Sequence, residues 1–191
     1  MSRISSTGFW TADNAVSHHV NCAPLGQWFV EYFKDEKDIP LYDFGCGMGF
    51  YANILQQNGF KYVTGFEGDP PQGKLFQNIV QQDLTKEFNV PAHGNALFLE
   101  VAEHIPAEFE QNALSNVTRS IGSGKKLVMS WAIRGQAGFG HVNCLDNHEA
   151  IAKVEAFGFK YLHDDSMAAR AVDLDQAPWF RNTILIFQQG K

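Results

Sequence analysis

The chain has 191 residues, a length that fits a single domain (1–191) with a hydrophobic core around a central sheet. Hydrophobic residues make up 45% of the chain and charged residues 19%, and no apolar run approaches the roughly 20 residues that a membrane-spanning helix needs. The formal net charge of -6 argues against a surface that binds nucleic acid, because such binding depends mainly on lysine and arginine. We therefore expect a globular protein with neither a membrane segment nor a nucleic-acid partner.

The N-terminus and the cysteines indicate the compartment. The first ten residues, MSRISSTGFW, lack the apolar core of a secretory signal. The cysteines Cys22, Cys46 and Cys144 are odd in number, and their spacing matches no metal motif. These features predict a cytoplasmic protein with reduced thiols.

Alternating strands and helices form the predicted core. Apolar residues at helical spacing predict an amphipathic helix over residues 23–35, so that residues 1–36 form an N-terminal lid and helix and residues 37–191 the core. The alternation that follows favours a mostly parallel sheet. The expected strands are LYDFG (41–45), KYVTGFE (61–67), NIVQQD (78–83), ALFLEV (96–101) and KKLVMSWA (125–132), and the expected helices cover residues 50–59, residues 107–121 and a segment ending at Gly158.

The pattern changes after Gly158. The segments FKYLH and TILIF are two expected strands with no convincing helix between them, which indicates an antiparallel pair at one edge of the sheet. The sequence thus predicts a three-layer α/β fold. Its seven-stranded sheet is expected to be mostly parallel, with an antiparallel C-terminal strand.

A glycine-rich turn links the first expected strand to the helix after it. The turn reads Asp43-Phe-Gly45-Cys46-Gly47-Met-Gly49. Missing β-carbons let backbone amides approach a ligand closely, and ligands of open α/β sheets bind at the carboxyl ends of the strands. A tight turn without a ligand is the plain alternative, because such a turn alone is a weak signal.

Two acidic residues end the next two expected strands. Glu67 follows the last loop glycine, Gly49, by 18 residues (67 - 49), where a carboxylate can accept hydrogen bonds from both hydroxyls of a ribose. Asp83 can accept a hydrogen bond from an adenine amino group while Leu84 packs on the ring. Asp43 discriminates between cofactors, because a carboxylate there repels a pyrophosphate but attracts the ammonium and sulfonium of S-adenosylmethionine (SAM). Singly, each acid is more often a solvated strand end.

The segments DFGCGMG, GFE, QQDLT and LEVAEHIP, in this order, resemble the motifs of class I SAM-dependent methyltransferases. The resemblance is strong over about residues 40–135 and implies the Rossmann-like fold of that superfamily, with SAM as cofactor and S-adenosylhomocysteine (SAH) as product. It also implies which residues surround the cofactor. These are Asp43, Gly45, Cys46, Gly47, Gly49, Glu67, Gly68, Asp83, Leu84, Glu100 and Val101.

Two histidines are candidates for catalysis, because a histidine is the usual proton acceptor near neutral pH. His104 follows the fourth expected strand, where the resemblance places residues between cofactor and acceptor; the alternative is a structural histidine that caps the next helix. His141 lies on the glycine-rich loop after the fifth strand, with Asn143 as a possible acceptor-binding partner, although such a loop can also hydrogen-bond only to itself.

Aromatic residues near the same edge are candidates for binding the substrate. Trp131 ends the fifth strand, and Trp10 and His19 belong to the expected lid; large aromatics are nevertheless more often core residues. No metal site is expected, because the spacing of His141, Asp146 and His148 matches no site with a recognisable mechanism.

The sequence therefore predicts a SAM-dependent methyltransferase that acts on an oxygen or nitrogen atom of an unidentified acceptor. A small molecule is favoured and a protein side chain is possible, and the protein is expected to be a monomer or a homodimer. Two alternatives remain. One is an NAD(P)-binding oxidoreductase, which shares the strand-loop-helix unit and the acid after the second strand. The other is a SAM-binding regulatory protein without catalysis, because fold and cofactor do not determine chemistry.

Overall fold

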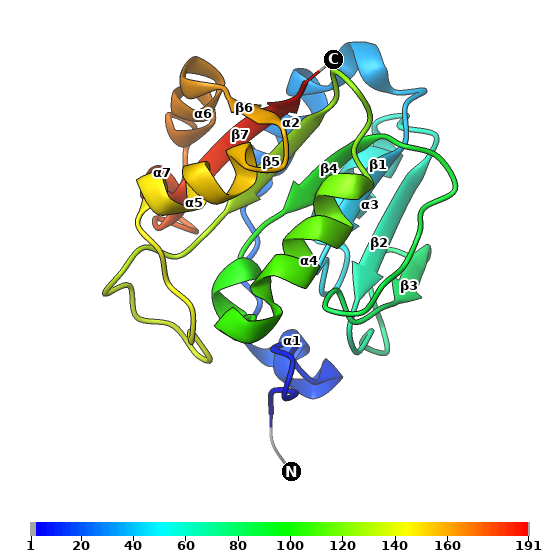
Figure 1. The fold of residues 1–191 in the computed structure, drawn as a ribbon. Helices are drawn as coiled ribbons and strands as arrows, with labels where there is room; N and C mark the ends of the chain where they lie inside the picture. The colour runs from blue at the N-terminus through cyan, green and yellow to red at the C-terminus, as the bar shows by residue number, and fades with distance from the viewer. Residues whose placement is uncertain (1–2, 191) are drawn as a thin grey trace.

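The computed structural model describes residues 3–190, which form a seven-stranded sheet between layers of helices (Figure 1). Along the sheet the strand order is β3-β2-β1-β4-β5-β7-β6. Neighbouring strands pair in parallel, except that β7 runs antiparallel to both β5 and β6. The mostly parallel sheet and the antiparallel C-terminal strand that the sequence predicted are therefore confirmed. The strands are β1 (Leu41–Phe44), β2 (Val63–Glu67), β3 (Ile79–Gln81), β4 (Asn95–Phe98), β5 (Lys126–Ser130), β6 (Phe159–Tyr161) and β7 (Ile184–Gln189).

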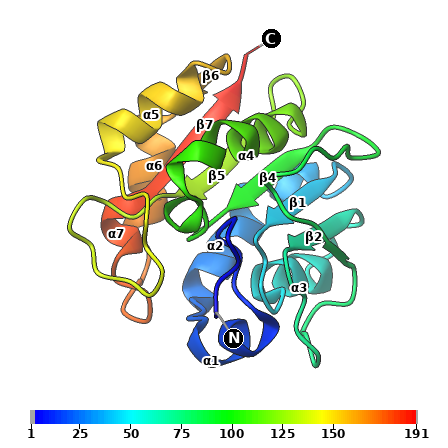
Figure 2. The same ribbon diagram turned by 60° about the horizontal axis from the view of Figure 1, so that its bottom comes forward.

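Helices cover both faces of the sheet and make the fold three layers deep. One face packs against α4 and α5, and the opposite face against α2, α3, α6 and α7. Helix α1 lies beyond the end of the sheet, as Figures 1 and 2 show. The helices are α1 (Ala12–His18), α2 (Ala23–Tyr32), α3 (Phe50–Gln57), α4 (Ala107–Arg119), α5 (Asn147–Glu155), α6 (His163–Arg170) and α7 (Phe180–Thr183).

The strand sequences explain why both faces are covered. In β4, Ala96 and Phe98 belong to the core cluster under α4 and α5, whereas Leu97 belongs to the cluster on the other face. Side chains alternate along a strand, so a strand that is apolar at every position must be buried on both sides. The near-continuous apolar runs of the sequence thus determine a central sheet rather than a sheet with one solvated face.

The order of the strands creates a crevice at the carboxyl edge of the sheet. β1 pairs with β2 on one side and with β4 on the other. The strands that follow β1 therefore extend the sheet first to one side, with β2 and β3, and then to the other, starting with β4. Ligands of open α/β sheets bind outside the carboxyl ends of the strands at such a switch point. The expected site residues Asp43, Glu67 and Glu100 all lie near these strand ends.

One sequence-based expectation about the C-terminal region was wrong. Two helices, α6 and α7, separate β6 from β7, where no convincing helix was expected. Helix α6 buries only Ser166 and Ala169, whose small side chains give no apolar periodicity. Ser166 also accepts a hydrogen bond from the Ile186 N–H (2.9 Å), which fastens the helix to β7.

The remaining boundaries differ by a few residues. The helix expected over residues 23–35 ends at Tyr32 and continues as a short 3-10 segment, Lys34–Glu36. The third strand is limited to Ile79–Gln81. Among residues 3–190, the structure contains no helix with the length and apolar character that crossing a membrane requires.

Candidate functional site

The glycine-rich turn joins β1 to α3 in a conformation that requires glycine. Gly45, Gly47 and Gly49 have φ angles of 73°, 54° and 77°, in the left-handed region. A β-carbon on Gly45 would lie 2.3 Å from Cγ2 of Val101, so the turn directly contacts the segment after β4. The Gly45 N–H donates to the carbonyl of Phe66 in β2 (2.8 Å). The turn is therefore held against both neighbouring strands.

Asp43, at the end of β1, places a carboxylate at the cavity beside this turn. The residue is 3% exposed, and its Oδ2 atom has no hydrogen-bond partner within the described part of the chain. Burial raises the pKa of the Asp43 carboxyl to about 7, because the charged form loses its hydration. An unpartnered buried oxygen of this kind fits a site that receives a cationic ligand.

Glu67 closes β2 and accepts two backbone hydrogen bonds at the same cavity. The Gly47 N–H donates to Oε2 (2.8 Å) and the Gly68 N–H donates to Oε1 (2.7 Å). Burial raises the pKa of the Glu67 carboxyl, while these hydrogen bonds act in the opposite direction. Glu67 thus connects the glycine-rich turn to the end of β2.

Asp83 lies one strand further along and is already engaged by the N-terminal segment. Its Oδ1 atom accepts hydrogen bonds from the N–H (2.9 Å) and the hydroxyl (2.7 Å) of Thr85. Its Oδ2 atom accepts a hydrogen bond from the Thr7 hydroxyl (2.9 Å). Leu84 lines the cavity next to Asp83. A ligand amino group that binds Asp83 must therefore share it with Thr7 or displace the Thr7 hydroxyl.

The N-terminal segment lines the cavity with residues 7–10 and 18–21. Contacts that only glycine permits fasten it at two points: a β-carbon on Gly47 would lie 1.7 Å from Cε1 of His19, and one on Gly68 would lie 2.2 Å from Cγ of Phe9. Trp10 stacks edge-on against His104 with ring centroids 5.1 Å apart. The segment thus covers the glycine-rich turn and brings Trp10 and His19 to the site.

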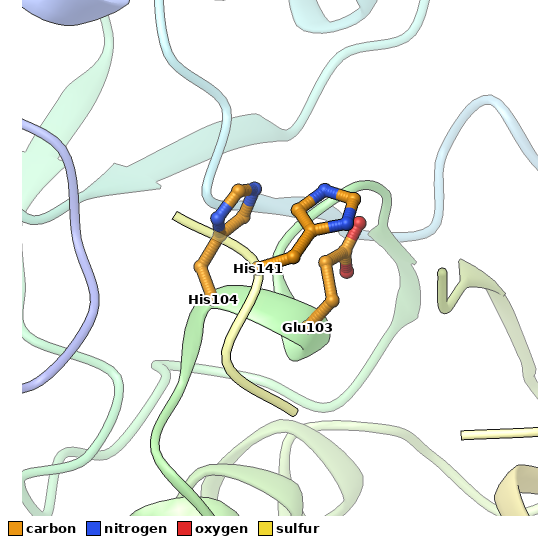
Figure 3. Close-up of side chains that lie close together, drawn as sticks. All are labelled: Glu103, His104 and His141. Carbon is orange, nitrogen blue, oxygen red and sulfur yellow. The ribbon is translucent and has the colours of Figure 1, made fainter. Parts of the chain in front are cut away.

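His104 and His141 lie side by side on the cavity wall, with ring centroids 5.0 Å apart (Figure 3). His104 belongs to a 3-10 segment, Ala102–His104, and its Nδ1 donates to the carbonyl of Gly140 (3.1 Å). His104 therefore contacts the loop that carries His141 and does not cap α4. Burial lowers the pKa of His104 to about 4, and the neighbouring imidazoles of His141 and His19 act in the same direction.

Two glutamates belong to the same segment as His104: Glu100 lines the cavity, whereas Glu103 is fully buried and does not. Glu100 has a φ of 55°, the only positive value at a non-glycine residue in the described range, and its carboxylate accepts a hydrogen bond from Ser130 (2.7 Å). Burial raises the pKa of the Glu100 carboxyl to about 7. Glu103 is 0% exposed, and burial together with the nearby Glu100 raises its pKa well above the usual range. Backbone strain and buried acids of this kind cluster at functional sites.

Two expected substrate-binding residues lie away from the cavity. Trp131 is 0% exposed in the core, and its Nε1 donates to the carbonyl of Asn143 (2.6 Å). The Asn143 side chain donates to Glu110 (2.9 Å). Neither residue lines the cavity that contains His104 and His141. These two residues therefore support the wall of the site from behind, and their expected contact with the substrate stays a prediction.

The sequence analysis missed three features of the site. Thr7 and Phe9 contact the cavity, and no pattern in the first ten residues assigns them a strand-end partner. Glu103 was passed over because a carboxylate next to a histidine in a polar segment looks solvated. The signal that could have identified Glu103 is its position between the apolar residues Ala102 and Ile105, which are both buried.

Solved structures identify the fold that these residues build. The sugar N-methyltransferase KedS8 from Streptoalloteichus sp ATCC 53650 is 15% identical with a TM-score of 0.66, over 88% of this chain and 88% of that chain. Magnesium protoporphyrin IX methyltransferase (ChlM) from Synechocystis PCC 6803, with bound SAH, is 16% identical with a TM-score of 0.61, over 86% and 82%. The 4+2 cyclase SpnF is 15% identical with a TM-score of 0.64, over 98% and 88%. No protein-family model and no curated protein matches the chain.

At these identities the likeness concerns the fold, and the chemistry must be argued from the site. The parallel strands β3-β2-β1-β4-β5, the antiparallel β7 inserted before β6, and the glycine-rich turn after β1 occur together in this chain. The chain therefore has the three-layer Rossmann-like fold of class I SAM-dependent methyltransferases.

Proposed function

We propose that the protein is a SAM-dependent methyltransferase that transfers a methyl group to an oxygen or nitrogen atom of a small molecule. The observation that carries the proposal is the buried, unpartnered carboxylate oxygen of Asp43 beside the glycine-rich turn. A carboxylate there attracts a cationic ligand and repels a pyrophosphate, which disfavours the oxidoreductase alternative. ChlM binds SAH in a structure of the same fold, which supports the same cofactor here.

The residues around the cavity fit the parts of SAM. Asp43 would hold the ammonium of the methionine portion, and Glu67 would accept hydrogen bonds from the ribose hydroxyls. Asp83 would accept a hydrogen bond from the adenine amino group, with Leu84 against the ring. The Thr7 hydroxyl donates a hydrogen bond to Asp83, so an adenine amino group has to share this carboxylate or displace the hydroxyl. The N-terminal segment is therefore proposed to act as a lid that moves when the cofactor binds.

The opposite end of the cavity fits a methyl acceptor. SAM, when bound, supplies a methyl group on a positively charged sulfur, which an aligned nucleophile can take by in-line displacement. The protein has to hold the acceptor close and accept its proton, and His104 and His141 bring imidazoles to this wall. Trp10 and Phe139 add aromatic surface, with ring centroids 5.9 Å apart. The indole N–H of Trp10 is buried without a hydrogen-bond partner in residues 3–190, so it is available to an acceptor atom.

The first test is the titration of the purified protein with SAH in a calorimeter. We expect micromolar binding, as for the product of a SAM enzyme, and about tenfold weaker binding in Glu67→Ala. The substitution removes the proposed ribose acceptor and also releases the N–H groups of Gly47 and Gly68. Both effects should lower the affinity for SAH.

The matched control is Glu87→Ala. The Glu87 side chain is 81% exposed and its ion pair with Arg119 is 4.0 Å long, so SAH binding should be unchanged. NADH should not bind. A folded protein that binds NADH and not SAH would contradict the proposal. SAH binding without methyl transfer to any acceptor in a broad small-molecule screen would favour the non-catalytic alternative.

Cofactor binding is expected to depend on pH through Asp43. Burial raises the pKa of Asp43 to about 7, and the ammonium of SAH needs the ionised form. Below pH 7 binding must first remove a proton, so the affinity should fall as the pH decreases, by up to about tenfold per pH unit, and should level off above pH 7. Calorimetric titrations on both sides of pH 7 measure this. A flat profile would contradict the role of Asp43, and Asp43→Asn should remove the dependence.

A further inference from the structure

The wall of the cavity contains a group of side chains that methyl transfer alone does not explain. Glu103, His104 and His141 each offer one potential ligand atom, and these three atoms lie within 4.8 Å of one another. Figure 3 shows the three side chains converging from two parts of the chain: Glu103 and His104 from the segment after β4, and His141 from the loop after β5.

The distances are close to those of a metal site. For three atoms within 4.8 Å of one another there is always a point no more than about 2.8 Å from each, whereas zinc binds imidazole nitrogen and carboxylate oxygen at about 2.0–2.2 Å. Shifts of about 0.6 Å in each side chain close the difference, which is within the range of small rotamer adjustments. The backbone does not have to rearrange.

Glu103 provides an independent observation. It is 0% exposed, and neither carboxylate oxygen has a hydrogen-bond partner among residues 3–190. The described lysines and arginines form no ion pair with it, although eight such pairs occur elsewhere in the structure. Its charged neighbour, Glu100, carries the same sign, so an ionised Glu103 is destabilised unless a cation compensates it, and a bound metal ion is such a partner.

A hydrogen bond to the backbone orients His104 for binding a metal ion. Its Nδ1 donates to the carbonyl of Gly140 (3.1 Å), which leaves the lone pair of Nε2 free. Metal-binding histidines commonly donate the proton on the other ring nitrogen to a carbonyl or carboxylate, because this hydrogen bond fixes the ring and the tautomer. Gly140 is next to His141, so the same contact joins the two segments that supply the ligands.

We propose that Glu103, His104 and His141 form a binding site for a divalent transition-metal ion of the zinc type. Two imidazoles and one carboxylate, with further positions open, are the ligand set of many catalytic zinc sites, whereas calcium and magnesium prefer oxygen ligands throughout. His104 and His141 line the cavity while Glu103 lies behind them, so the open position faces the cavity. There it would bind an oxygen or nitrogen atom of the methyl acceptor, with the two imidazoles as metal ligands instead of proton acceptors, a role that rests on the proposed function.

The sequence analysis expected no metal, on the spacing of His141, Asp146 and His148. The proposed site uses a different group. His141 is the one shared member, and its partners come from a segment more than 30 residues earlier in the chain, so no local spacing motif exists. His148 lies outside the proposed site on α5 and is exposed.

The test is a calorimetric titration of the full chain, stripped with EDTA, with zinc chloride. We expect about one zinc ion per chain at micromolar affinity or better, and at least a 100-fold loss of affinity in Glu103→Gln and in His141→Ala. His148→Ala is the matched control and should bind zinc like the unaltered protein. Excess magnesium should not displace the zinc, because the site offers two nitrogen ligands.

Absence of zinc binding to the folded, stripped protein would overturn the inference, as would binding that His141→Ala and Glu103→Gln leave unchanged. Circular dichroism of each variant shows whether it is folded. A titration of the stripped protein with SAH separates this inference from the proposed function. Zinc binding without SAH binding would contradict only the methyltransferase proposal, and SAH binding without zinc binding would contradict only the metal site.

Discussion

Asp43→Asn is expected to weaken the binding of SAM and SAH about 100-fold, which corresponds to about 2.7 kcal/mol, while leaving the protein folded. Asparagine keeps the shape of the side chain and a hydrogen-bond acceptor but removes the charge that is proposed to face the ammonium. Interactions between two charged groups are strong where water is excluded, and Asp43 is 3% exposed. Calorimetry with SAH measures the change in affinity.

The thermal stability of Asp43→Asn provides a second readout. Burial raises the pKa of Asp43 to about 7, so the native protein loses stability when this group is charged, and a neutral amide should leave the Tm unchanged or higher. Asp38→Asn is the control, because Asp38 pairs with Lys61 on the surface with 71% of its side chain exposed. Equal SAH affinity in Asp43→Asn and the unaltered protein would show that Asp43 does not contact the cofactor.

The sequence predicted the core of the fold because the patterns that indicate its strands, turns and helices each lie within a short stretch of the chain. The strand LYDFG, its glycine-rich turn and the next helix are adjacent in the chain, and the φ angles of Gly45, Gly47 and Gly49 confirm the turn that their spacing indicated. Consecutive apolar residues, such as Ala96, Leu97 and Phe98 in β4, are buried on alternate faces of a parallel sheet, which explains the three layers. Asp43 and Glu67 then reach one cavity because parallel strands end at the same edge of the sheet.

The features that the sequence did not predict depend on contacts between distant segments. The hydrogen bond from Thr7 to Asp83 joins residues 76 positions apart. The group formed by Glu103 and His141 requires the loop after β5 to fold back onto the segment after β4. Helix α6 was missed for a different reason, because a helix that buries Ser166 and Ala169 has no apolar stripe.

The position of the two histidines matters for the kind of chemistry that this fold supports here. KedS8 and ChlM are methyltransferases, whereas SpnF is a cyclase, so the fold alone does not specify methyl transfer. The proposed cofactor side of the cavity contains Asp43 and Glu67, and the proposed acceptor side contains His104 and His141. If His104 and His141 act on the acceptor as proposed, their replacement should change the reaction without altering the sheet.

Trp131→Ala is expected to lower the free energy of unfolding by about 3–5 kcal/mol and the Tm by about 10 °C, with little change in SAH affinity per folded molecule. Trp131 is 0% exposed, so the substitution leaves a cavity in the core, and it also removes the hydrogen bond from the indole to the Asn143 carbonyl. Differential scanning calorimetry gives the Tm, and titration below the lowered Tm gives the affinity.

Trp10→Ala is the matched comparison and should give the opposite result. Trp10 lines the cavity and contacts His104 and His19 with ring centroids 5.1 and 5.6 Å apart, so its loss should weaken ligand binding while the Tm changes by only a few degrees. If Trp131→Ala instead lost binding and kept its Tm, Trp131 would contact the ligand, as the sequence analysis expected. The sequence does not distinguish the two tryptophans, since each lies near a predicted site. Their burial does: Trp131 is expected to stabilise the fold, and Trp10 to face the ligand.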